Sequence, residues 1–115
     1  MRKVLRKRAV DVTKGLSPAL MEQLFSVMAG YFSVLSESSR LRIIYAVCGG
    51  EKSVSEVVAL CGSSQANISR QLAALQKAGI LSRRKEGVTV YYAIADEGTV
   101  GMCQLICAKI AQDLH

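Results

Sequence analysis

The clearest chemical pattern in the sequence is a run of hydroxyl, amide and cationic side chains over residues 64–71. Amide side chains suit the hydrogen-bonding edge of adenine, and an arginine suits guanine or a phosphate. A hydroxyl at the start of a helix can hold a phosphate together with the free backbone amides. We expect this run to contact DNA through Ser64, Gln65, Asn67, Ser69, Arg70 and Gln71.

A second candidate is the cationic cluster of Arg83, Arg84 and Lys85. The cluster precedes a Glu86-Gly87 turn, and residues 88–94 then alternate between apolar and polar side chains as a strand does. This pattern predicts a β-hairpin with the three cations near its tip. We expect these cations to contact phosphates, which would make binding dependent on salt.

Positive charge is concentrated in two places. Residues 1–16 hold six cations and one acid, so they carry +5 of the formal net charge of +6. In the remainder, residues 63–92 hold five cations against a single acid. Such a concentration is typical of a surface that binds a polyanion. We expect residues 1–16 to form a flexible basic arm and residues 17–115 to form one domain for DNA binding and dimerisation.

Four thiols could carry redox or soft-metal chemistry, at Cys48, Cys61, Cys103 and Cys107. The sequence has neither an apolar run of membrane-spanning length nor a signal core, so we expect a cytoplasmic protein without membrane association. Permanent disulfides are disfavoured in that compartment. The one histidine is His115, and there is no Gly-rich phosphate loop, so we expect no enzymatic activity, no cofactor and no assigned metal ligand.

The spacing of apolar residues predicts four helices before the hairpin, at about residues 17–35, 36–48, 53–61 and 64–78. Hydroxyl residues open these helices as N-caps, and glycines end the last three of them. The third and fourth helices are joined by a tight glycine turn, which is typical of a helix-turn-helix. We expect the second helix to be mostly buried, and in the fourth helix Ile68, Leu72 and Leu75 would face the core.

A last helix is predicted from Glu97 to the C-terminus. Its apolar residues follow a spacing of three and four that suits a seam between two helices. The seam consists of Val100, Cys103, Cys107, Ile110 and Leu114. The predicted fold class is therefore mainly α with a β-hairpin wing, a winged helix-turn-helix.

This order of elements, together with the segment SSQANISRQLAALQKAGILSRRKEGVTVYY, resembles the ArsR/SmtB family of bacterial repressors. The resemblance covers residues 18–114. It implies a homodimer formed through the first and last helices, bound to an inverted-repeat operator in double-stranded DNA and released by a small inducer. The chain departs from the family at Gln71, where histidine is common, and at Ser63, where an aliphatic residue is usual.

Neither of the family's usual metal sites is matched. Ser53 and Ser55 stand where its thiol-rich site has cysteines, and a hydroxyl is a poor ligand for a soft metal. The family's other site needs aspartate and histidine on the last helix, where this chain has Lys109 and Gln112. An inducer sensed by side chains would therefore meet the cysteines.

Cys48 and Cys107 are similarly placed to the cysteine pair of the family's sulfane-sulfur and redox sensors, each about one helical turn out of register. We expect reactive sulfur or an oxidant to link this pair and release the DNA, with Cys61 and Cys103 second in order. One alternative is a soft metal or arsenite held by Cys103, Cys107 and their dimer mates. Another is that all four thiols are small core residues. An alternative of another class is a winged-helix module for protein interaction.

Overall fold

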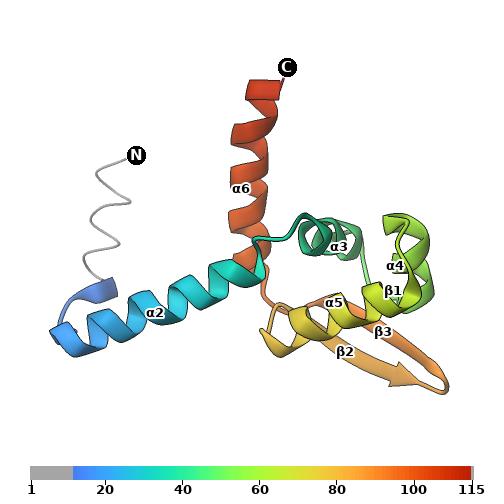
Figure 1. Cartoon of the computed structure of the whole chain (residues 1–115), viewed down its shortest axis with the longest axis horizontal. Helices are drawn as coiled ribbons and strands as arrows, with labels where there is room; N and C mark the ends of the chain where they lie inside the picture. Colours follow the sequence, from blue (N-terminus) through green and yellow to red (C-terminus); the bar gives the residue numbers. More distant parts are fainter. Residues whose placement is uncertain (1–11, 115) are drawn as a thin grey trace. The chain divides into compact units, whose positions relative to one another are not determined.

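The structure is a computed structural model, and it describes residues 12–114. The packing divides the chain into two units, one that ends at Ser33 and one from Val34 onward. The predicted basic arm, residues 1–16, lies mostly outside the described residues. Helices and strands carry the labels of Figure 1.

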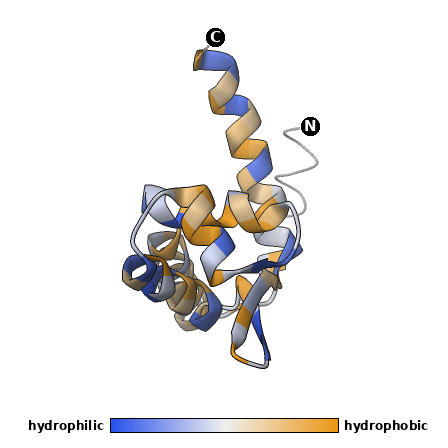
Figure 2. Ribbon diagram, turned by 90° about the vertical axis from the view of Figure 1, so that its right-hand side faces the viewer, coloured by the Kyte–Doolittle hydropathy of each residue, from blue (hydrophilic) through white to orange (hydrophobic). Residues whose placement is uncertain are grey.

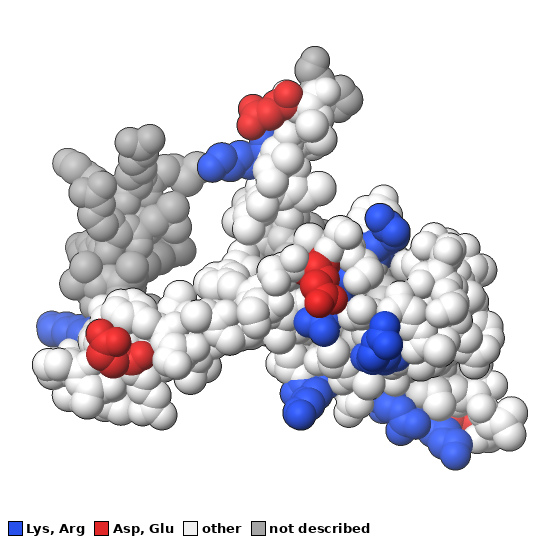
Figure 3. Space-filling model, viewed as in Figure 1, with Lys and Arg blue, Asp and Glu red and all other residues white. Residues whose placement is uncertain are grey.

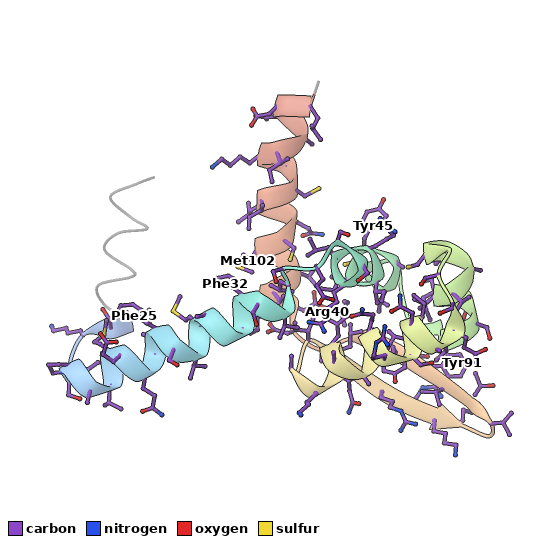
Figure 4. All side chains as sticks on the ribbon, in the orientation of Figure 1. Phe25, Phe32, Arg40, Tyr45, Tyr91 and Met102 are labelled. Carbon is purple, nitrogen blue, oxygen red and sulfur yellow. The ribbon has the colours of Figure 1, made fainter. Side chains whose placement is uncertain are left out.

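The first unit is dominated by helix α2 (Pro18–Val34). The Ser17 hydroxyl accepts a hydrogen bond from the Leu20 amide at 3.2 Å, so Ser17 opens the helix as predicted. Pro18 fits the first helical position because the amide there has no partner within the helix. No residue of α2 is buried, and the rings of Phe25 and Phe32 remain about half exposed (Figure 4). Helix α2 therefore keeps an apolar surface.

The second unit packs three helices with a small antiparallel sheet (Figure 1). The helices are α3 (Ser38–Cys48), α4 (Val54–Cys61) and α5 (Gln65–Lys77). The strands are β1 (Lys52–Ser53), β2 (Leu81–Glu86) and β3 (Thr89–Ile94), in the order β1-β3-β2. Apolar residues from every helix of this group and from the hairpin make the core: Ile43, Ile44, Val47, Val57, Ile68, Leu72, Leu75, Ile80, Leu81 and Tyr92.

Local capping explains why α4 and α5 form where the sequence predicts them. The Ser53 hydroxyl accepts from the Glu56 amide, and the Glu56 carboxylate accepts from the Ser53 amide at 2.9 Å, which completes a capping box. Gly62 ends α4 with φ of +69°, a conformation that favours glycine. The Ser64 hydroxyl then accepts from the Asn67 amide at 3.1 Å and opens α5. The predicted helix-turn-helix is confirmed.

Helix α3 differs from its prediction in two ways. Its N-cap residue is Glu37, whose side chain makes no capping hydrogen bond, in place of the capping hydroxyl that we expected. The helix was also expected to be mostly buried, whereas only Ile43, Ile44 and Val47 are. Tyr45 is 82% exposed, so α3 buries one face only.

The hairpin forms as predicted, but its turn is shifted by one residue: Glu86 belongs to β2 and pairs with Thr89, and the turn consists of Gly87 and Val88. Gly87 adopts φ of +62° in the turn, and Arg83 and Arg84 pair with Tyr92 and Tyr91 of β3. Val88, which we expected to be the first residue of the returning strand, lies before β3 and is 97% exposed. Strand β1 was not predicted, because two residues are too few to show alternation.

The last helix, α6 (Glu97–Leu114), begins where it was predicted. The Asp96 carboxylate accepts from the Thr99 amide at 3.2 Å and from the Thr99 hydroxyl at 2.7 Å, which fixes the first turn. Only Thr99 and Val100 are buried, and apolar and polar residues alternate along the rest of the helix (Figure 2). The predicted seam beyond Val100 is therefore largely uncovered within one chain.

No helix in the described part of the chain is long and apolar enough to cross a membrane alone. Helices α2 and α3 meet that criterion only as a broken pair, by length and composition.

Candidate nucleic-acid interface

Helix α5 separates a buried side from a polar side. Its apolar residues Ile68, Leu72 and Leu75 are at most 1% exposed, as predicted. On the other side the predicted contact residues Ser64, Gln65, Ser69 and Arg70 are exposed, and Asn67 is half buried. The first two turns of α5 therefore offer hydroxyl, amide and guanidinium groups to solvent.

Asn67 organises this polar edge. Its side-chain nitrogen donates to the Ser63 hydroxyl at 2.8 Å, and its side-chain oxygen accepts from Arg70 Nη2 at 2.6 Å. Asn67 keeps a second N–H donor and a second oxygen lone pair, and Arg70 keeps further guanidinium donors. The sequence marked Ser63 as unusual for the family, and the structure shows a use for its hydroxyl: it anchors Asn67.

The expectation that Gln71 lies on the exposed face is wrong. Gln71 is 9% exposed, and its side-chain oxygen accepts from Arg40 Nε at 2.7 Å. Arg40 belongs to the first turn of α3 (Figure 4), so this bond joins α3 to α5, and Arg40 also donates to the Val34 carbonyl oxygen at 3.2 Å. Helical spacing could have revealed the burial, because Gln71 is three residues after Ile68 and four before Leu75. Nothing in the sequence identified Arg40 as its partner.

The three hairpin cations are exposed but do not share one face. The register pairs Arg83 with Tyr92 and Lys85 with Val90, so these two cations lie on the face of β2 that carries buried Leu81. Neither makes an ion pair with a described residue. Lys and Arg side chains line the hairpin edge of the second unit (Figure 3). Arg83 and Lys85 are thus available to an anion.

Arg84 lies on the opposite face of the hairpin, and it is already engaged. Its Nη2 and Nε lie 2.7 and 3.1 Å from the two carboxylate oxygens of Glu51, and its Nη1 lies 2.6 Å from Glu86 Oε2. The guanidinium carbon also lies 4.6 Å from the ring centroid of Tyr91. The sequence predicted phosphate contacts for Arg83, Arg84 and Lys85 alike, and it did not identify Glu51 as a partner of Arg84.

The ionisation of this cluster follows from its hydrogen bonds. The hydrogen bond from Arg84 holds the pKa of Glu51 below its usual value of 4.5. Hydrogen bonds to Glu51 and Glu86 raise the pKa of Arg84 still further above its usual value. Glu51 and Arg84 are therefore charged at neutral pH, and two acidic side chains, Glu51 and Glu86, surround the single guanidinium.

All four thiols are free, with Cys48 and Cys107 exposed and Cys61 and Cys103 half buried. Partial burial raises the pKa of the Cys48 thiol, and the nearby Glu97 carboxylate, followed by the Cys103 thiol, raises it further. Cys103 is therefore near Cys48, and Cys107 lies one helical turn further along α6. Among residues 12–114, no three histidine, cysteine or acidic side chains are grouped closely enough to hold a metal ion.

Two sequence comparisons identify relatives. The family model described as bacterial regulatory protein, arsR family, matches residues 37–83, which run from the N-cap of α3 into β2. An uncharacterised HTH-type transcriptional regulator of Mycobacterium tuberculosis is 32% identical over 75 residues, or 64% of this chain and 66% of the relative. The match therefore spans slightly less than two thirds of that relative's length.

Solved structures show the same fold. The homodimeric winged helix-turn-helix DNA-binding domain of a possible ArsR-family regulator from Mycobacterium bovis superposes with a TM-score of 0.73. It is 28% identical, with 88% of this chain and 93% of that domain covered. The transcriptional regulator HlyU from Vibrio vulnificus gives a TM-score of 0.66 at 32% identity, with 76% and 92% covered. The chain is a winged helix-turn-helix protein and belongs to the ArsR family of bacterial regulatory proteins.

Proposed function

We propose that this chain is a homodimeric transcriptional repressor that binds double-stranded operator DNA. The carrying observation is the exposed polar edge of α5, where Gln65, Ser69 and Arg70 stand free of the core. An α-helix fits the major groove, and its N-terminal residues reach base edges. The exposed cations Arg83 and Lys85 of the hairpin supply phosphate contacts that position the helix.

A homodimer is supported by two apolar surfaces that one chain leaves uncovered. Helix α2 buries no residue, and Ile106 and Ile110 of α6 are about half exposed. The related domain from Mycobacterium bovis is described as homodimeric. A twofold dimer presents two α5 helices to successive major grooves, which lie about 34 Å apart. Such a dimer selects an inverted repeat.

The experiment selects bound duplexes from a random pool and compares wild type with Arg70→Ala. We expect wild type to enrich an inverted repeat and Arg70→Ala to lose preference at one base pair of each half-site. Lys109→Gln on α6 removes a cation from an element that does not contact DNA, so it should select the same repeat. Recovery of unrelated sequences by wild type would contradict the proposal and favour a module for protein interaction.

The proposed signal for release is cysteine chemistry that joins Cys48 of α3 to a thiol of α6. With peroxide as oxidant, the two thiols lose two protons and two electrons, one disulfide forms, and the peroxide becomes two waters. Cys107 is the partner by family resemblance, whereas Cys103 is the α6 thiol near enough to influence the pKa of Cys48. The bond would restrain α3, which packs on α5, and so change how α5 is presented.

Separate Cys48→Ser, Cys103→Ser and Cys107→Ser variants test this step. Loss of the peroxide response in Cys48→Ser and in one of the other two identifies the pair, and peptide mapping should show that disulfide. If all three variants release DNA like wild type, these thiols do not sense the oxidant and release has another cause. Arsenite in place of peroxide tests the soft-metal alternative with the same variants.

A further inference from the structure

We propose that Arg84 is a positioning residue that fastens the hairpin to the turn before β1, and that it is not a phosphate contact. The inference rests on the proposed function only where it concerns DNA binding by the hairpin. The contact between Arg84 and Glu51 is present in the chain without DNA. It separates Arg84 from its neighbours Arg83 and Lys85, which carry the same charge.

The geometry of the sheet makes this role specific to position 84. Arg84 starts from β2 at one edge of the sheet, crosses Tyr91 of β3, and reaches Glu51, the residue before β1 at the other edge. One side chain thus spans all three strands. The register places Arg83 and Lys85 on the other face, where they cannot make this contact.

The contacts also oppose a second role on DNA. A bidentate pair with Glu51, a third contact with Glu86 and the ring of Tyr91 occupy most of the guanidinium. A phosphate would have to displace carboxylates that already satisfy these donors, and it would approach a cluster with excess negative charge. Exposed ion pairs contribute little one at a time, but a planar fork held on three sides fixes an orientation.

The first test uses hydrogen exchange of the DNA-free protein. Arg84→Gln should make the amides of β1 and β3 exchange about two- to fivefold faster, the range expected for loss of an exposed ion pair. Glu51→Gln should do the same, and the double variant should be no faster than either single variant. Arg83→Gln is the matched control and should leave exchange unchanged. In Arg84→Gln, the pKa of Glu51 measured by NMR titration should rise towards 4.5.

The second test measures affinity for the selected duplex against salt. Log affinity falls linearly with log salt concentration, and loss of one phosphate contact makes this negative slope shallower by about 0.9. Arg83→Gln removes one contact from each chain of the dimer, so we expect its slope to be shallower by about 1.8. Arg84→Gln should weaken binding at every salt concentration and leave the slope unchanged. A slope that is shallower by about 1.8 in Arg84→Gln, together with unchanged exchange, would overturn the proposal. If wild type binds no duplex, the proposed function fails, and the exchange experiment alone decides the role of Arg84.

Discussion

The polar edge of α5 and the β2–β3 hairpin both present cations, but they are organised over different distances. On α5, Ser63, Asn67 and Arg70 are linked by hydrogen bonds between residues three and four apart in the chain. On the hairpin, Arg84 is held by Glu51, which is 33 residues away. The α5 edge is thus a local property of one helix, whereas the hairpin depends on the rest of the unit. Chemically similar cations acquire different roles for this reason.

The largest effect should come from the buried side of α5. Leu72 is fully buried, so Leu72→Ala should lower the free energy of unfolding by about 2–5 kcal/mol. Ala73, the next residue, is exposed. Ala73→Ser serves as the matched control and should change the free energy of unfolding by only a few tenths of a kcal/mol. Urea unfolding followed by circular dichroism measures both. Equal stability of Leu72→Ala and wild type would show that α5 does not pack as described.

The next effect concerns base reading by the exposed side of the same helix. Arg70→Ala should remove about 1–3 kcal/mol of discrimination at one base pair, and Gln65→Ala should do so at another. Lys77→Ala, in the last turn of α5, is the control and should keep the full preference. Titration of duplexes with single base-pair changes measures these differences. Uniform weakening across all duplexes would assign Arg70 to the phosphates.

The third effect concerns helix capping, and it tests whether hydrogen bonds between residues close in the sequence stabilise the helix-turn-helix. Ser53→Ala should lower the free energy of unfolding by about 1 kcal/mol, because the Glu56 amide loses its acceptor. Ser55→Ala is the control, since Ser55 is exposed inside α4 and alanine favours a helix. A larger loss for Ser55→Ala than for Ser53→Ala would contradict the capping box.

The same contrast explains what the sequence could predict. Caps at Ser53 and Ser64 and the turn at Gly62 act within three or four residues, so the helix-turn-helix was predicted correctly. The pairing of Arg40 with Gln71 and of Glu51 with Arg84 joins residues more than thirty positions apart. Such contacts depend on how elements pack, and no local pattern encodes them. They account for the grouping of Arg84 with Arg83 and Lys85, whereas the burial of Gln71 follows from its helical spacing to Ile68 and Leu75 and could have been predicted.

A smaller effect is expected in the reactivity of Cys48. Burial raises its pKa above the usual 9.0, so the thiol is almost fully protonated at neutral pH. The rate of alkylation by iodoacetamide, plotted against pH, should therefore have its midpoint above pH 9 in the folded protein. In urea, where the burial is lost, the midpoint should fall to about 9. Mass spectrometry of the Cys48 peptide follows the rate. A midpoint below 9 in the folded protein would make Cys48 an activated thiol.

The most direct test of the central claim is the affinity of wild type for the selected inverted repeat and for a scrambled duplex over a range of salt concentrations. The account predicts that the protein binds the repeat at least about a thousandfold more tightly than the scrambled duplex. Its affinity for both duplexes should fall as the salt concentration rises. It also predicts that two chains bind each repeat. Equal, salt-independent affinity for both duplexes, or binding as a single chain, would contradict the account.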